Sequence, residues 1–240
     1  MSLLDLFRMG GVFMWPLLIF SIATVSITIE RIIFLAYHDL KMEDMGEQLS
    51  TFIRAGNIRK AKSYLEGLTS RKIGVPILAS LVKRSYISEH DLEKIVETES
   101  LTCINSLENG FNFLTALGSL APLTGFLGTV SGMIGAFRSI AEAPEVNAQI
   151  VANGIYEALI TTAFGLIIAL IAMVAHSLLS HVVDKFTTAV ERVCSDLIME
   201  ITSRNREIHS QHHKDDHEAP LPMLTTGEKR PSVYSLGDYT

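Results

Sequence analysis

The stretch of sequence that decides the fold lies between residues 110 and 183 and contains two long apolar segments. The first reads FNFLTALGSLAPLTGFLGTVSGMIGAF (111–137), and the second reads GIYEALITTAFGLIIALIAMVAHSLL (154–179). The only Asp, Glu, Lys or Arg in either segment is Glu157. At about 1.5 Å per helical residue, each segment is longer than the roughly 30 Å hydrocarbon core of a bilayer. Both segments are therefore predicted to be transmembrane helices.

Small residues recur along both segments at the three- and four-residue steps of a helix. Helices in lipid gain little from hydrophobic association, so small residues are used instead to bring backbones close together. We therefore predict that both helices pack tightly against other helices, from this chain or from its copies. The predicted stripes are Gly118, Ala121, Gly125, Gly128, Gly132 and Gly135 on the first helix, and Gly154, Ala158, Thr162, Gly165, Ala169 and Ala172 on the second.

Polar side chains accompany these stripes, and two interpretations of them stay open. A carboxylate near the membrane costs several kcal/mol unless it is neutralised, paired or hydrated, so Glu157 favours a functional role. Alternatively, Glu157 lies at the hydrated interface and the threonines donate to carbonyls of the preceding turn. The predicted pathway residues are Thr115, Thr129, Thr161, Thr162 and Glu157, with Pro122 on the same seam as Thr115 and Thr129.

A third apolar segment lies near the N-terminus, over residues 10–29. Its helical pattern continues past Glu30 and Arg31, and no small-residue cleavage site precedes these charges. A transmembrane helix is therefore predicted here rather than a signal peptide. Trp15 and Tyr37 are expected to mark the two membrane interfaces.

Composition agrees with a membrane protein that is not an enzyme. The mean hydropathy is +0.30, and 48% of residues are hydrophobic. The net charge is −6, so the chain lacks the excess of basic residues that binding to nucleic acid requires. There is no phosphate-binding loop and no nucleophile–base constellation, so no cofactor is expected. Cys103 and Cys194 are interpreted as reduced structural cysteines. Energy for any work is then expected from a transmembrane ion gradient.

The predicted fold is an all-α membrane protein with three transmembrane helices, of which the second and third extend far into the cytoplasm, plus a small helical cytoplasmic lobe. One helix is expected to run from about residue 89 to residue 140, with a kink or a free carbonyl at Pro122. The predicted division is a first helix with its N-terminal segment (1–37), a cytoplasmic helical loop (38–109), the second span (110–141), a periplasmic loop (142–153), the third span (154–183), a cytoplasmic extension (184–206) and a disordered tail (207–240).

Basic residues predict the orientation. Lys and Arg are frequent in 38–109 and recur in 184–206, whereas none lies in 139–153. By the positive-inside rule, the N-terminus is periplasmic and the C-terminus cytoplasmic.

The tail contains four histidines, His209, His212, His213 and His217. An adventitious metal site is favoured there over a specific one.

Two motifs point to a known family. GSLAPLTGFLGTVSGMIGAF (118–137) and NGIYEALITTAFGLIIAL (153–170) resemble the signature helices of the MotA/TolQ/ExbB proton-channel family. The paired patterns A-P-x-x-G-x-x-G-T-V and G-I-x-E-A-L-x-x-T-A-x-G-L are distinctive. The resemblance covers about residues 1–205 and is strongest in 115–170. Size and three-span topology match ExbB and TolQ more than MotA, which has a fourth span.

The resemblance implies a mechanism. Family members form a homopentamer whose second and third spans line a pore, with two ExbD/TolR-like single-span partners inside. A partner aspartate carries the proton, the pentamer rotates around the partner dimer, and a TonB/TolA-like protein can receive the work. By motif, Thr129 and Thr162 line the pore beside that aspartate and Glu157 lies in its outer part. A hydroxyl suits this place because it donates to a carboxylate and accepts from a carboxylic acid.

Some features depart from the family pattern or leave alternatives open. Ile171 occupies a position where the family often has proline, and Ser131 replaces a common tryptophan. Threonine and glutamate oxygens also coordinate sodium, so the coupling ion stays open. A non-conducting membrane scaffold would need the small-residue stripes but not the polar set, and gliding or secretion motors of the same family fit equally well.

Overall fold

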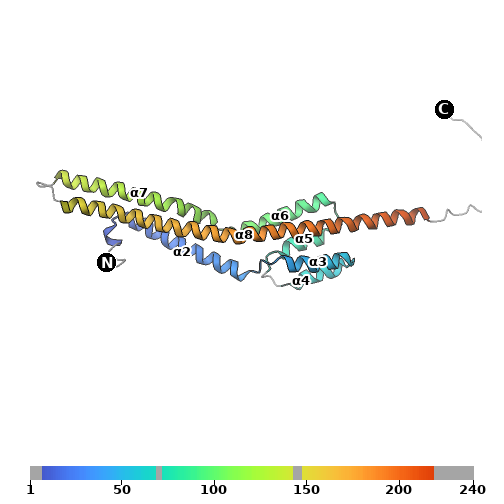
Figure 1. The fold of residues 1–240 in the computed structure, drawn as a ribbon. Helices are drawn as coiled ribbons and strands as arrows, with labels where there is room; N and C mark the ends of the chain where they lie inside the picture. Colours follow the sequence, from blue (N-terminus) through green and yellow to red (C-terminus); the bar gives the residue numbers. More distant parts are fainter. Residues whose placement is uncertain (1–6, 69–71, 143–147, 219–240) are drawn as a thin grey trace, which may run out of the picture. The chain divides into compact units, whose positions relative to one another are not determined.

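The computed structural model describes residues 7–68, 72–142 and 148–218 (Figure 1). Every named element among these residues is an α-helix, which confirms the all-α prediction. Three helices contain stretches long and apolar enough to cross a membrane, within Met14–Tyr37, Phe111–Glu142 and Val151–Glu207. The chain divides into two compact units, Met1–Thr202 and Ser203–Thr240. Of the second unit, the structure describes a helical segment that ends at Glu218.

Helix α2 (Met14–Tyr37) begins just before Pro16, which is tolerated in a first helical turn because the missing N–H has no partner there. One face of α2 is buried and carries Met14, Leu17, Thr24, Arg31 and Leu35. The opposite face exposes large apolar side chains such as those of Ile19, Ile22 and Ile33. An apolar exposed face on a helix of this length is the pattern of a lipid-facing span.

Helices α7 (Phe111–Glu142) and α8 (Ala148–Glu218) form the predicted hairpin and lie side by side (Figure 1). A Cβ added at Gly125 would lie 2.8 Å from the carbonyl oxygen of Thr161, and one at Gly132 would lie 3.1 Å from that of Gly154. A Cβ at Gly165 would lie 2.5 Å from the carbonyl oxygen of Ala121. The two backbones therefore touch directly, and these glycines leave the room for it.

The centre of the α7–α8 interface lies next to two members of the predicted stripes rather than on them. Gly135 is exposed, and a Cβ there would meet nothing within 4 Å in this chain. Ala136 is buried instead and contacts Gly154, because four residues after Gly132 return to the same helix face better than three. On α8, Thr161 rather than Thr162 lies at the centre of the interface. Packing of Gly135 against another copy stays a prediction.

The prediction of one unbroken helix from residue 89 to residue 140 is wrong. Helix α6 (Glu89–Leu107) ends before α7 begins at Phe111. Gly110 between them has φ 88°, a left-handed conformation that glycine adopts at no steric cost. The Asn109–Gly110 pair is a turn signal that the apolar pattern on both sides outweighed in the sequence-based prediction. Pro122, in contrast, lies inside α7 without ending it, although its missing N–H leaves the carbonyl of Gly118 without its helical donor.

The lobe between α2 and α7 consists of α3 (Glu43–Arg54), α4 (Ile58–Glu66), α5 (Val75–Lys83) and α6. Asn57 accepts a hydrogen bond from the backbone N–H of Lys60, and Ser88 accepts one from that of Asp91, so both side chains cap the helices that follow them. The lobe shares one continuous apolar core with α8, including Met45, Leu49, Ile77, Leu81, Leu92, Val190, Leu197 and Ile201.

Helix α8 is longer at both ends than predicted. It begins at Ala148, so residues 148–153 are helical rather than part of the predicted loop, and it continues beyond Arg206 to Glu218. No Gly or Pro occurs between Arg206 and Pro220, so nothing in the composition interrupts the helix there. The predicted loop residues 143–147 and the predicted disordered residues 219–240 lie outside the described residues.

Replacing Gly165 with alanine is expected to lower the stability of the folded chain in detergent by about 1–3 kcal/mol. The new Cβ would meet the Ala121 carbonyl, which is backbone and cannot rotate away. Thermal unfolding followed by circular dichroism measures this effect. Gly135→Ala is the matched control, because it fills open space and adds helix propensity of up to about 1 kcal/mol. Equal melting temperatures for the two variants would contradict the close α7–α8 packing.

Candidate ion pathway

Two neighbouring threonines of α8 meet one carbonyl of α7. The hydroxyl of Thr162 donates to the carbonyl oxygen of Gly125 at 3.1 Å, and the hydroxyl of Thr161 points to the same oxygen at 3.4 Å. The contact is possible because Gly125 has no side chain to hold the helices apart. The small-residue stripe therefore does more than pack: it brings hydroxyls of one helix to the backbone of the other.

The two threonines have different surroundings. Thr161 is 1% exposed, donates to the carbonyl of Ala158 at 2.8 Å and fills the space beside Gly128. Thr162 is only partly buried and keeps one side accessible. Of these two threonines, Thr161 therefore joins α7 to α8, whereas Thr162 stays accessible to groups outside the hairpin.

The predicted pathway threonines of α7 lie apart from one another. Thr129 is partly buried, one helical turn beyond Gly125, and donates to the carbonyl of Phe126 at 2.6 Å. Thr115 is exposed near the start of α7 and donates to the carbonyl of Phe111 at 3.2 Å. Both hydroxyls are thus satisfied inside their own helix. The structure brings Thr129 to the level of the Thr162–Gly125 contact and leaves Thr115 about two to three turns away along the helix.

Glu157 lies against the segment that precedes α2. Gly11 has φ 68°, and a Cβ on it would overlap the carboxylate of Glu157. Gly10 lies against Met14 and Ile160 in the same way. The Gly10–Gly11 pair therefore lets the chain turn closely around the Glu157 side chain. Sequence analysis did not single out this contact, although two consecutive glycines before a predicted helix are a turn signal.

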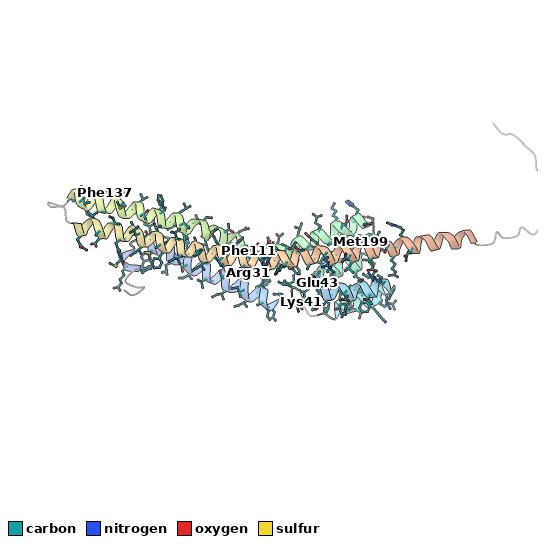
Figure 2. The ribbon with its side chains drawn as sticks, in the orientation of Figure 1. Arg31, Lys41, Glu43, Phe111, Phe137 and Met199 are labelled. Carbon is teal, nitrogen blue, oxygen red and sulfur yellow. The ribbon has the colours of Figure 1, made fainter. Side chains whose placement is uncertain are left out.

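Arg31 is a second residue whose environment the sequence did not reveal. It is 7% exposed although it lies in a membrane-spanning helix. Its guanidinium pairs with Glu30, donates to the carbonyl of Ser106 at 3.4 Å and lies 4.9 Å from the ring centre of Phe34. It also approaches Gly110, and Figure 2 shows it close to Phe111. Arg31 therefore holds α2 against the break between α6 and α7 and donates to one carbonyl, that of Ser106, at the C-terminal end of α6.

The remaining reactive groups do not form a site among the described residues. No group of three His, Cys, Asp or Glu side chains in that part of the chain could hold a metal ion. Burial raises the pKa of the Cys103 thiol to about 11, so this thiol stays protonated and unreactive at neutral pH. The polar groups of the two spans are thus hydroxyls, the Glu157 carboxylate, the His176 imidazole and backbone carbonyls, which can transfer protons or coordinate small cations.

Comparison with known proteins gives consistent matches. The model of the MotA/TolQ/ExbB proton channel family matches residues 68–192, which include α5, α6, α7 and much of α8. The Tol-Pal system protein TolQ of Haemophilus influenzae is 40% identical over 100 residues, covering 37% of this chain and 44% of TolQ. The biopolymer transport protein ExbB of Salmonella typhimurium is 30% identical over 101 residues, covering 42% of this chain and 41% of that protein.

A third relative matches over a longer range. An ExbB-like biopolymer transport protein of Synechocystis is 33% identical over 180 residues, covering 74% of this chain and 70% of that relative. The chain thus spans less than half of the TolQ and ExbB relatives but over two thirds of the ExbB-like one. All three matches fall in the same family as the family model.

Replacing Gly11 with alanine is expected to destabilise the protein by about 1–3 kcal/mol, because alanine disfavours a positive φ and its Cβ would overlap the Glu157 carboxylate. In the double variant with Glu157→Ala, only the backbone cost should remain, so part of the stability returns. Thermal unfolding in detergent measures both. The matched control is Gly67→Ala, which has φ −80° and room for a methyl group. A Gly11→Ala variant as stable as this control would show that Glu157 does not pack on the turn.

Proposed function

Because the chain belongs to the MotA/TolQ/ExbB proton channel family, we propose that it is the ion-conducting subunit of an energy-transducing complex in the bacterial inner membrane. The complex uses the proton motive force, about 2.3 kcal/mol per elementary charge for each 100 mV, to do mechanical work on the cell envelope. TonB-dependent uptake is one form of that work. Protein transport and envelope maintenance use the same chemistry.

One observation carries this proposal. The α7–α8 hairpin holds the partly exposed hydroxyl of Thr162 on the carbonyl of Gly125, with Thr129 one turn further along α7. A transmembrane hairpin needs small residues for packing, but packing alone does not need a half-accessible threonine beside a second one on the neighbouring helix. The arrangement suits a carboxyl group that changes protonation. Each hydroxyl can accept from the neutral form while it donates to its carbonyl, and it can donate to the charged form once it rotates away from that carbonyl.

The complex that we propose contains five copies of this chain around a dimer of ExbD/TolR-like single-span partners. The second and third spans line the pore, and an aspartate of the partner carries the proton past Thr129 and Thr162. Glu157 lies toward the outer end of the pathway, five residues before Thr162 on α8. A TonB/TolA-like protein receives the work.

The orientation that we propose has the N-terminus in the periplasm and the helical lobe with the end of α8 in the cytoplasm. Support comes from the basic residues, which are numerous in 38–109 and absent from 139–153. The Glu157 carboxylate and the Gly10–Gly11 turn then lie toward the periplasmic side, where protons enter. Arg31 and the α6–α7 break lie toward the cytoplasmic side.

Replacing Thr162 with valine is expected to leave assembly intact and abolish ion-coupled work, because valine has nearly the same shape but no hydroxyl. Proton flux into vesicles containing this chain and its single-span partner measures the loss, and growth that depends on energised uptake measures the work. Thr162→Ser restores the hydroxyl and is expected to retain activity.

The matched control is Thr161→Val, which removes a neighbouring hydroxyl that is buried inside the hairpin. This variant is expected to assemble and to conduct. Full activity of Thr162→Val would overturn the pathway assignment and favour the non-conducting scaffold. Loss of activity in both valine variants together with loss of assembly would show that the hydroxyls act through packing alone.

A further inference from the structure

A groove with an apolar floor lies in the lobe between α6 and α8. Its volume is about 380 Å³. Val96 and Ile104 of α6 and Val190 and Ile198 of α8 line its floor, and the exposed side chains of Leu101 and Met199 lie at its edge. All of these residues belong to the Met1–Thr202 unit. An exposed apolar groove of this kind marks a surface that another chain covers.

The rim of this groove carries negative charge. Glu89, Glu93 and Glu97 follow one another on α6 at four-residue steps, and Glu191 of α8 lies among the lining residues. No Lys or Arg lines the groove, and within the described residues none of these four carboxylates forms an ion pair. The groove therefore favours an occupant that combines an apolar side chain with positive charge.

The same chain exposes a segment with this chemistry. Lys83 and Arg84 end α5, are exposed and form no ion pair in the described part of the chain. Tyr86 follows them and is 80% exposed, although its ring is large and largely apolar. We refer to residues 83–86 as the basic turn. A protruding ring beside two cations is the counterpart of an apolar groove with an acidic rim.

The basic turn and one end of the groove lie at the same level along the helices. Phe111 contacts His176, with 5.7 Å between ring centres. Glu89 lies 22 residues before Phe111 (111 − 89), and Met199 lies 23 residues after His176 (199 − 176). Glu89 and Met199 therefore lie near the same level, and Figure 2 shows Met199 at the far end of α6. The basic turn precedes Glu89 by only a few residues.

Level matters because copies of a membrane protein are related by rotation about the membrane normal. Such a rotation moves no residue along the helices, so only residues at equal levels can meet. We propose that the basic turn of one copy docks in the α6–α8 groove of the next copy, with Tyr86 against Met199 and with Lys83 and Arg84 facing Glu89 and Glu93. This contact joins two different surfaces, so repeating it closes a ring.

The inference rests on the proposed function only in assuming that the chain assembles with copies of itself. It adds the residues that join the copies outside the membrane. It also gives the acidic rim a partner on another copy of the same protein, so no different protein is needed. Ion conduction through Thr162 does not enter the argument, so the two proposals can fail separately.

Disulfide formation between copies tests the docking. In a background with Cys103→Ser and Cys194→Ala, one tagged copy carries Tyr86→Cys and a second, differently tagged copy carries Met199→Cys. The two are expressed together with the single-span partner and oxidised in membranes. A linked product that carries both tags is expected. Each copy has one cysteine, so this product forms only between two copies.

The matched control pairs Tyr86→Cys with Leu101→Cys. Leu101 is exposed in the same groove but lies twelve residues beyond Glu89 (101 − 89), or about 18 Å along α6. Little product is expected from this pair. Equal linking at both positions, no linking at Met199, or linking of Met199→Cys to a different protein would each overturn the proposal.

Charge reversal provides a second measurement. Glu93→Lys is expected to lower the yield of the Tyr86–Met199 link about tenfold, because it places like charges together. Adding Arg84→Glu to both copies is expected to restore the yield. Absence of this rescue would overturn the pairing. The link is also expected to form unchanged in the Thr162→Val background, which separates a failure of docking from a failure of conduction.

Discussion

The structure depends on the direct contact between the backbones of α7 and α8. At Gly125, Gly132 and Gly165 the atom nearest to the missing Cβ is a backbone carbonyl oxygen of the other helix. The hydrophobic effect does not drive this contact inside a bilayer, because the surrounding lipid is already apolar. Dispersion forces and the hydrogen bonds of two threonines stabilise it instead. Everything else in the membrane region follows, because α2 and the segment before it pack on a pair of helices whose spacing is already set.

The same contact connects stability with function. A hydroxyl that reaches the Gly125 carbonyl can do so only while the helices stay this close, so the glycines position Thr162 as well as pack the hairpin. Thr161 and Thr162 are neighbours in sequence, yet one is enclosed and the other is accessible. A helix turns by about 100° per residue, which is enough to give adjacent threonines different surroundings.

Much of this arrangement could be predicted from the sequence because the bilayer imposes strong rules on length and composition. The three spans, the helical lobe, the Ser88 cap and most of the small-residue stripe are such cases. Predictions were wrong where a single residue decides the outcome. Gly110 is such a case, because it interrupts an apolar pattern that continues on both sides. The environments of Glu157 and Arg31 depend on segments far away in sequence, which periodicity does not report.

The break at Gly110 has a mechanical consequence. A rotation or tilt of α7 in the membrane is not obliged to turn α6, because a non-helical turn separates the two helices. Helix α8 is continuous from the membrane span to the lobe, so a movement of its membrane segment passes directly to the lobe. A displacement of the hairpin would therefore reach the helical lobe mainly through α8, and Arg31 contacts the turn that separates α6 from α7.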